Sequence, residues 1–302
     1  MTSPAKIHSL PLVYVIVLNW NRPADTVECV RAVCQSQYSH LHTLIVDNHS
    51  SDDSVSQLRA AFPDIQIFVN PKNLGYAEGN NVGIRWALQE GAEHVLLLND
   101  DAFVEPGTIA QMVSAATLNV AAVGCKVRLW EDAARLWAAG ECFPRGKYPV
   151  DNGEFDDSRE IRYAVGCCIL MTRPALEAVG LLDGEMFAVH EEKDWCYRAR
   201  AAGFRIVYNP MAAVNHKVGS SFTTAGSAAY HYLFVRNQLL FWRHSDNLPM
   251  NWRWINHAWW LWRQEIGFIR HNGGAKLRRA WGATWGVVDY GRGRFGPPPE
   301  TF

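Results

Sequence analysis

Four short apolar runs, separated by helix-like stretches, recur through the first hundred residues, and this alternation limits the folds open to the chain. The runs cover residues 12–18, 44–46, 65–69 and 95–98. The first and the last are continuously apolar, as is typical of parallel strands covered on both faces. We therefore predict an α/β fold in which a doubly wound, mostly parallel sheet carries helices on both faces.

The stretches between the runs carry helical signals. Pro23 stands where a helix can begin, and apolar residues then recur at helical spacing. A second stretch of this kind covers residues 79–90. In the first stretch Val27, Val30 and Cys34 fall on one face, and the apolar residues of the second are Val82, Trp86 and Leu88.

The pattern is less regular in the second half of the chain. Glycine and proline are frequent in residues 125–165, which predicts loops. Apolar order returns at residues 163–171, followed by a short helical pattern at 175–179 and a strand pattern at 205–208. From Tyr230 onward the sequence predicts helices.

The C-terminal segment differs from the body in composition. Eight of the 13 tryptophans lie at or after Trp242, and from there on Lys and Arg outnumber Asp and Glu by nine to four. Such residues suit a membrane interface, but a helical layer packed on the rest of the protein explains them equally well. We expect an α/β domain at 1–240 and a basic, Trp-rich helical extension at 241–302.

Charge and cysteine content exclude several classes of protein. The net charge of −1 provides no overall basic field, so nucleic acid is not an expected partner. The seven cysteines are an odd number and contain no C-x-x-C pair, so a disulfide framework is not expected and a reducing cytosol fits best. No secretion signal or membrane-spanning apolar run is present. We expect a cytoplasmic protein, with peripheral contact at the inner face of the cell membrane through residues 242–302 left open.

Polar residues follow two of the predicted strands. In parallel sheets, ligands bind beyond the carboxyl ends of the strands, so side chains delivered there from separate strands can converge on one ligand. The alternative is that Asp and Asn simply begin turns, as they often do. The residues concerned are Asp47, Asn48 and Ser50 after the second strand and Asn99, Asp100 and Asp101 after the fourth.

The second of these groups has the character of a metal site. Hard cations such as Mg²⁺ and Mn²⁺ prefer oxygen ligands and keep positions open for phosphate oxygens, which makes Asp101 the first candidate ligand. Residues 73–81 add glycines and asparagines between a strand and a helix, where a backbone can approach a diphosphate closely. A plain loop with a helix cap explains residues 73–81 nearly as well.

The densest acidic cluster is the segment 190–194, His-Glu-Glu-Lys-Asp. A charged run is usually a solvated helix face. Here Phe187 and Trp195 flank the cluster, so some of its carboxylates are expected to face a partly apolar interior, where the pKa of a base can be tuned. A zincin motif is excluded because Asp194 stands where the second histidine would be needed. The glycines of G-x-G-x-x-G at 291–296 lack the strand-turn-helix context of a dinucleotide site.

Seven motifs follow one another between residues 12 and 240. They are V-I-V-L-N-W-N at 15–21, L-I-V-D-N-H-S-S-D at 44–52, N-L-G-Y-A-E-G-N-N at 73–81, L-L-L-N-D-D at 96–101, G-C-C-I-L-M at 166–171, F-A-V-H-E-E-K-D-W-C-Y-R at 187–198 and H-K-V-G-S-S at 216–221. In this order they resemble glycosyltransferase family 2, which has the GT-A fold, and within it the branch that includes bacterial rhamnosyltransferases.

The resemblance implies roles for the residues that bind donor and metal. Asp47 would hydrogen-bond the nucleobase of a nucleotide-sugar donor. Asp101 would bind a divalent metal, Mn²⁺ or Mg²⁺, as the second Asp of a D-x-D motif. His216 would complete the metal site, and an imidazole ligand favours Mn²⁺. The residues expected to line the nucleotide sugar are Asn19, Asn73, Gly75, Asn81, Asn99 and Asp100. Arg236 is a candidate for positive charge near the phosphates, and the alternative is a surface or core-capping arginine.

The resemblance also implies a catalytic base. The family motif is usually Glu-Asp-x-Asp, with its first Asp as the base, and here Glu192 occupies that position. Asp194 would orient the acceptor hydroxyl. Glu191 or Asp194 would be the base if the motif is shifted.

The expected reaction is a single inverting displacement in cell-surface polysaccharide synthesis. The metal would neutralise charge on the departing diphosphate, and the base would take a proton from a hydroxyl of a glycan or lipid-linked acceptor. Two other classes stay open at this point. A sugar nucleotidyltransferase also uses strand-end carboxylates and a metal, and the many tryptophans are compatible with a non-catalytic carbohydrate-binding protein.

Overall fold

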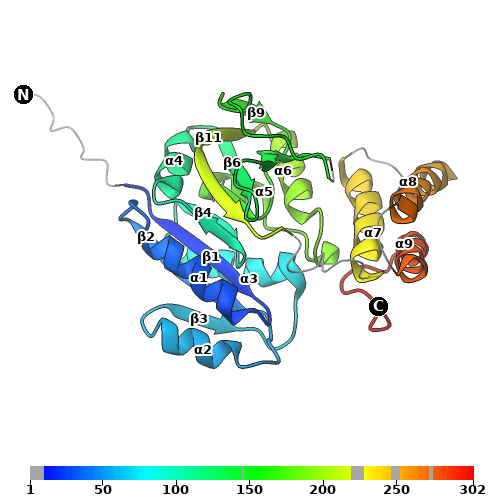
Figure 1. The fold of residues 1–302 in the computed structure, drawn as a ribbon, viewed down its shortest axis with the longest axis horizontal. Helices are drawn as coiled ribbons and strands as arrows, with labels where there is room; N and C mark the ends of the chain where they lie inside the picture. Colours follow the sequence, from blue (N-terminus) through cyan, green and yellow to red (C-terminus); the bar gives the residue numbers. More distant parts are fainter. Residues whose placement is uncertain (1–9, 145, 219–227, 246–251, 272–274) are drawn as a thin grey trace, which may run out of the picture.

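The computed structural model describes residues 10–144, 146–218, 228–245, 252–271 and 275–302 (Figure 1). The first elements along the chain are β1 (Val13–Asn19), α1 (Pro23–Cys34), β2 (Leu41–Asp47), α2 (Ser54–Ala61), β3 (Gln66–Val69), α3 (Gly75–Gln89), β4 (His94–Asn99), β5 (Ala102–Val104) and α4 (Thr108–Ala115). The middle elements are β6 (Val120–Leu129), β7 (Leu136–Ala139), β8 (Glu141–Cys142), β9 (Arg159–Ile161), β10 (Cys168–Thr172), α5 (Arg173–Val179), the 3₁₀ helix η1 (Gly184–Met186), α6 (Glu191–Ala201) and β11 (Arg205–His216). The last are α7 (Ala228–Ser245), α8 (Trp252–His271) and α9 (Lys276–Gly291).

Eleven strands of the described residues form one sheet. Strands β3, β2, β1 and β4 lie side by side in this order, and every pair among them is parallel. Beyond β4 the sheet is mixed, because β10 is antiparallel to both β4 and β6, while β11 is parallel to β6 and antiparallel to β5. The predicted doubly wound sheet is confirmed, and its purely parallel part consists of the first four strands.

Helices cover both faces of the sheet. The apolar side chains of α1, α2 and α4 pack against one face, where the odd-numbered valines of β1 point. The side chains of α3, α5 and α6 pack against the opposite face, with Ile16 of β1. Because β1 is buried on both sides, its sequence is continuously apolar rather than alternating.

The inward face of α1 differs by about one residue from the predicted one. The buried positions are Thr26, Cys29, Val30 and Val33, whereas Cys34 is exposed. Val30 was therefore predicted correctly and Cys34 wrongly. Thr26 is buried because its hydroxyl donates to Asn19 Oδ1 at 2.7 Å, a polar contact that an apolar pattern cannot reveal.

The packing face of α3 consists of small residues. Gly79 and Gly83 lie over β1, where an added Cβ atom would come within 2.9 Å of Leu18 and 2.8 Å of Ile16. Gly75 has a φ of +76° and leaves no room for a Cβ beside Phe187. The second predicted stretch, residues 79–90, lies almost wholly in this helix, which begins earlier, at Gly75. Val82, Trp86 and Leu88 are partly buried, and the last two pack against the core.

Residues 125–165 contain more regular structure than predicted. Half of β6, the hairpin of β7 and β8, and β9 fall within them. These strands are short or end in register irregularities, as between Val127 and Arg128, so they leave little periodicity in the sequence.

The three C-terminal helices gather at one side of the molecule, with α7 nearest the sheet (Figure 1). They share a hydrophobic core that includes Leu240, Leu261 and Ala283, together with Met186 from η1. The predicted boundary after residue 240 falls inside α7, so we propose that the helical unit begins at Ala228. Within the described residues, no helix is long and apolar enough to cross a membrane.

Candidate active site

The ends of β1 and β2 meet at the carboxyl edge of the sheet. Asn19 is the last residue of β1 and pairs in register with Asp47 of β2. Its amide nitrogen donates to Asp47 Oδ2 at 2.7 Å. Asp47 also accepts from the backbone nitrogen of Ser50 at 2.9 Å and from its hydroxyl at 2.6 Å. The structure thus brings Asn19 and Asp47 together, fully buried, at the edge where a donor is expected.

Asn48 shapes the loop that leads into α3. Its side-chain nitrogen donates to Asn73 Oδ1 at 2.9 Å and to the Gly75 carbonyl at 3.0 Å, and its oxygen accepts from the Leu74 backbone at 3.0 Å. Asn73 in turn accepts from the Gly75 nitrogen at 2.8 Å. No separate role was predicted for Asn48 from the sequence. Its position directly after Asp47 could have indicated one, because its side chain reaches residues 73–75 from the end of β2.

Two predicted donor-binding residues are engaged elsewhere. Both amide protons of Asn81 are donated inside the chain, to Glu78 Oε2 at 2.8 Å and to the Leu182 carbonyl at 2.9 Å. Arg236 of α7 is 0% exposed. Its guanidinium donates to Asn237 Oδ1, to the Tyr232 hydroxyl and to the carbonyls of Gly296, Glu185 and Met186. All five of its N–H groups are therefore committed, and the predicted phosphate contact would require the loss of these bonds.

Asp101 and His216 lie in contact, as the resemblance implied. His216 ends β11, and its Nε2 atom lies 3.1 Å from Asp101 Oδ1. The His216 ring packs edge-on against Trp137, with 4.9 Å between the ring centroids. Its Nδ1 atom is buried without a hydrogen-bond partner among the described residues. The rest of the H-K-V-G-S-S motif, from Gly219 on, lies outside the described residues.

Arg22 faces the Asp100–Asp101 pair from the loop after β1. Its guanidinium lies 3.2 Å from Asp101 Oδ2 and 3.9 Å from Asp100 Oδ1. Burial and the neighbouring Asp101 charge raise the pKa of Asp100 well above its usual range, and Arg22 opposes that shift. Arg22 also pairs with Asp25, which Lys217 contacts at 2.7 Å. Neither Arg22 nor Lys217 was predicted from the sequence as a site residue. Arg22 directly follows Asn21, the end of the first motif, and Lys217 directly follows His216.

The chemistry of this corner fits a divalent cation held partly by the donor. A carboxylate and an imidazole are suitable ligands for Mn²⁺, and Asp101 Oδ1 faces His216 Nε2 at 3.1 Å. No group of three or more His, Cys, Asp or Glu side chains converges at one point in the described part of the chain. A divalent ion at this corner would have Asp101 and His216 as protein ligands and would take its others from phosphate oxygens or water.

The acidic cluster begins α6 and lies against residues 166–167, which also touch the N-D-D motif. The Cys167 carbonyl accepts from the Asn99 backbone nitrogen at 2.9 Å. The carboxyl group of Glu192 lies against Gly166, where an added Cβ would be 3.4 Å from Glu192 Cδ. Burial, and then Cys125 and Cys142, raise the pKa of the Cys167 thiol, with smaller contributions from Asp101 and Glu192. Glu192 and the N-D-D motif are therefore neighbours across residues 166–167.

Glu191 and Glu192 lie in surroundings that favour the protonated carboxyl. Burial, and then the charge of Glu192, raise the pKa of Glu191 well above its usual range. Burial raises the pKa of Glu192 as well, against opposing hydrogen bonds from backbone N–H groups. Glu191 Oε2 has no hydrogen-bond partner among the described residues. Tyr76 of α3 closes this side of the cluster by donating to the Gly166 carbonyl at 2.7 Å.

Asp194 is held by two basic side chains. Its side chain is 1% exposed and accepts from Arg198 Nε at 2.8 Å and from His244 Nδ1 at 2.9 Å. Burial alone would raise the pKa of Asp194, but these two partners outweigh it and lower the pKa. Because both carboxylate oxygens are occupied, the structure gives Asp194 a link to α7 in place of the predicted contact with an acceptor hydroxyl.

The comparisons with known proteins agree with this geometry. The family model described as "Glycosyltransferase like family 2" matches residues 11–230. A low-salt glycan biosynthesis hexosyltransferase of Haloferax volcanii is 28% identical over 205 residues, which cover 65% of this chain and 66% of that enzyme. The dTDP-rhamnosyl transferase RfbF of Shigella flexneri is 21% identical over 248 residues, covering 79% of this chain and 82% of the relative.

A third relative is named for a lipid-linked acceptor. The N-acetylglucosaminyl-diphospho-decaprenol L-rhamnosyltransferase of Mycobacterium tuberculosis is 26% identical over 245 residues, covering 69% of this chain and 78% of the relative. These names favour sugar transfer over the nucleotidyltransferase and carbohydrate-binding alternatives.

Solved structures share the fold. The mannosyltransferase PcManGT from Pyrobaculum calidifontis, in complex with GDP-Man and Mn²⁺, aligns with a TM-score of 0.57 at 16% identity, over 93% of this chain and 74% of that one. GalNAc-T7 with UDP, GalNAc and Mn²⁺ aligns with a TM-score of 0.62 at 13% identity, over 93% of this chain and 57% of that one. The sheet order and the match over residues 11–230 together show that the chain belongs to glycosyltransferase family 2 and has the GT-A fold.

Proposed function

We propose that this glycosyltransferase moves rhamnose, with inversion, from a dTDP-linked donor to a hydroxyl of a lipid-linked glycan. The observation that carries the mechanism is the proximity of the Asp101–His216 pair to Glu192 across residues 166–167. The rhamnosyltransferase relatives support the choice of donor, and the decaprenol-named relative supports the choice of acceptor.

Asp101 and His216 would hold a divalent metal. When bound, Mn²⁺ or Mg²⁺ supplies positive charge that stabilises the departing diphosphate. Arg22 adds a fixed positive charge at the same corner, 3.2 Å from Asp101. Asn19 and Asp47 close the strand edge where the nucleobase would bind, and the loop held by Asn48 would face the nucleotide.

Glu192 would act as the base. A base must be ionised to accept a proton, and a raised pKa makes it a stronger proton acceptor. Glu191 lies beside it, and its pKa is also raised, first by burial and then by the charge of Glu192. The acceptor hydroxyl would lose its proton to Glu192 as its oxygen bonds to the anomeric carbon and the bond to the diphosphate breaks.

The reaction is tested with purified protein, dTDP-rhamnose and an N-acetylglucosaminyl-diphosphoprenol, with and without Mn²⁺. We expect release of dTDP that requires acceptor and metal, and a product of inverted anomeric configuration by NMR. UDP-, GDP- and other dTDP-sugars in parallel identify the donor. Transfer from one of these sugars alone would overturn the choice of rhamnose, and pyrophosphate release from a nucleoside triphosphate and a sugar phosphate would instead indicate nucleotidyl transfer.

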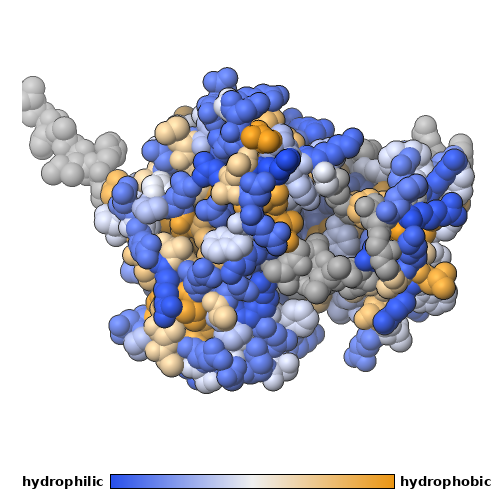
Figure 2. Space-filling model, in the orientation of Figure 1, coloured by the Kyte–Doolittle hydropathy of each residue, from blue (hydrophilic) through white to orange (hydrophobic). Residues whose placement is uncertain are grey.

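We also propose that the helical unit contacts the surface of an anionic membrane. Figure 2 shows hydrophobic residues at the outer surface of this unit among hydrophilic ones. Trp259 is 57% exposed and Trp281 is 56% exposed, and Leu277 lies near Trp281. The guanidinium of Arg263 lies over the Trp259 ring, 5.4 Å from its centroid. Exposed indole rings beside cationic groups suit the headgroup region of a bilayer.

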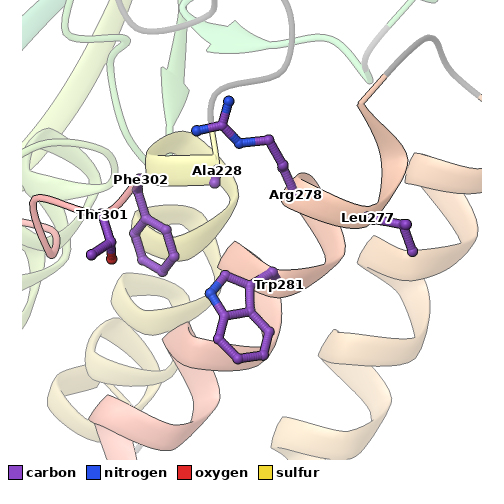
Figure 3. A pocket seen from close by; sticks show the side chains of 6 residues that line it. All are labelled: Ala228, Leu277, Arg278, Trp281, Thr301 and Phe302. Atoms are coloured by element: carbon purple, nitrogen blue, oxygen red, sulfur yellow. The ribbon is translucent and has the colours of Figure 1, made fainter.

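A hollow of about 280 Å³ lies in this surface, between the start of α7 and α9 (Figure 3). Its walls include Leu277, Trp281 and Phe302, with Arg278 beside them. An apolar hollow with a cation at its margin suits the junction between a lipid chain and its phosphate groups. This arrangement would bring a lipid-linked acceptor to the protein from the membrane.

Co-sedimentation with liposomes that contain phosphatidylglycerol tests the membrane contact. We expect the protein to sediment at low salt and to dissociate as salt screens the basic residues. Replacing both Trp259 and Trp281 by Ser should reduce binding at least tenfold, whereas Leu118→Ser, an exposed apolar residue outside the helical unit, should not. Equal binding by both variants would overturn the proposed surface.

A further inference from the structure

The residues before α6 adopt an unusual backbone conformation. Phe187, Val189 and His190 have φ values of 62°, 74° and 78°, in the region that side chains other than glycine rarely adopt. Glu191 follows directly, as the first residue of α6. Such conformations persist only where surrounding contacts hold them, and they cluster at functional sites.

Asn237 of α7 provides these contacts. Its side-chain nitrogen lies 2.7 Å from the Met186 carbonyl, 2.7 Å from the Ala188 carbonyl and 2.8 Å from the Val189 carbonyl. The Asn237 oxygen accepts from Arg236 Nε at 2.9 Å, which fixes the orientation of the amide. One fully buried side chain from the helical unit therefore gathers the carbonyls of the strained loop.

Further along α7, two more residues reach the first turn of α6. Phe241 lies under the ammonium group of Lys193, 4.3 Å from the ring centroid. His244 donates to Asp194 at 2.9 Å. Positions 237, 241 and 244 are spaced by four and three residues, so they form one stripe of the helix. We call Asn237, Phe241 and His244 the α7 clamp.

We propose that the α7 clamp positions the acidic pair Glu191–Glu192 for the transfer reaction. The clamp touches the residues before the pair and the residues after it, and the pair itself carries the chemistry. Asn237 and His244 are then positioning residues, which act through the loop and through Asp194. The inference rests on the proposed role of Glu192, and it makes the helical unit part of the catalytic apparatus.

The test compares Asn237→Ala with Asn209→Ala. Asn209 is also buried and donates to a backbone carbonyl, that of Gln111 at 2.9 Å, but it lies on β11 away from α6. Both variants lose buried hydrogen bonds and should melt at lower temperature. Only Asn237→Ala should lower kcat, by roughly 10²-fold, because a displacement of about 1 Å can cost that much. The KM for dTDP-rhamnose should stay within about twofold.

Hydrogen exchange supplies a readout that does not depend on the sugar. Amide exchange in residues 185–194 should accelerate in Asn237→Ala and remain at the parental rate in Asn209→Ala. If the parent transfers no sugar, the proposed function fails while this measurement still tests the clamp. Parental exchange in residues 185–194, or equal kcat in the two variants, would overturn the inference.

A second pair of variants covers the case in which Asn237→Ala does not fold. His244 is partly exposed, so its replacement leaves the core intact. His244→Leu removes the hydrogen bond to Asp194, and His244→Asn can restore a donor near the position of Nδ1. We expect kcat to fall in the first and to recover at least partly in the second. Equal kcat in both would contradict the proposal.

Discussion

His216 Nε2 lies 3.1 Å from Asp101 Oδ1, although 115 positions separate the two residues in the chain. The register of β11 beside β5 brings them together, since His216 pairs with Ala102, the residue after Asp101. The contact is therefore fixed by the pairing of strands in the sheet.

Asp101→Ala and His216→Ala should each weaken Mn²⁺-dependent binding of dTDP at least tenfold, because each removes one of two protein ligands. Isothermal titration with and without Mn²⁺ measures the effect. Asp64→Ala, an exposed carboxylate outside the site, serves as the control. Binding that is indifferent to a chelator, or full Mn²⁺ affinity in His216→Ala, would show that the assigned metal site is wrong.

Glu192→Gln keeps the shape of the side chain and removes the proton acceptor. Turnover should fall by roughly 10²–10⁴-fold while dTDP binding survives. Glu192→Asp, which restores the usual family residue, should show whether the longer side chain matters. If Glu192→Gln retains parental turnover and Glu191→Gln is inactive, the base is Glu191.

Glu191→Gln should stabilise the protein at neutral pH. The folded protein binds a proton at Glu191 more tightly than the unfolded chain does, because burial raises its pKa. The stability of the parent should therefore fall as pH rises from the ordinary value of 4.5 through the raised pKa, and the variant should escape that loss. Urea unfolding at pH 4 and pH 7 measures the difference. A variant less stable than the parent at pH 7 would contradict the buried, unpaired state of this carboxyl.

The pair of His244 and Asp194 should stabilise the fold over a bounded range of pH. The hydrogen bond to Asp194 raises the pKa of His244, so the stabilisation is complete below the ordinary value of 6.5 and is lost as pH rises through the raised pKa. The pKa of Asp194 is lowered, so the stabilisation is also lost as pH falls from the ordinary value of 3.8 through the lowered pKa. The parent should exceed His244→Leu in stability by about 1 kcal/mol between these limits, as measured by urea unfolding. A difference that grows above pH 7 would refute the ion pair.

The parts of the site that the sequence predicted are those set by strand ends. Continuously apolar β1 and β4 reveal buried parallel strands, and the polar residues that follow must then share one edge of the sheet. Asn19, Asp47 and Asp101 lie there for that reason. The contact of His216 with Asp101 came from the family resemblance, because no local pattern reports pairing between β11 and β5.

The parts that sequence could not predict depend on side-chain direction. Arg236 and Asp194 have residue types that suit an active site. Yet Arg236 is buried against the loop that α7 holds, and Asp194 is buried against α7 itself. Asn81 also suits an active site by residue type, but its side chain donates to the Leu182 carbonyl. The type of a charged or amide residue does not show whether its hydrogen-bond partners belong to the protein or to a ligand.

The glycines of α3 set a limit on the variation that the enzyme can accept. An added Cβ would come within 2.8 Å of Ile16 at position 83 and within 2.9 Å of Leu18 at position 79, so either glycine can gain a carbon only if the facing side chain shifts or becomes smaller. If positions 16 and 83 were randomised together, the functional clones should contain pairs of nearly constant summed volume, with Gly83→Ala found mainly where a residue smaller than isoleucine stands at position 16. The distance between this helix and the strand that ends at Asn19 is thus encoded jointly by two residues, and each position limits the drift of the other.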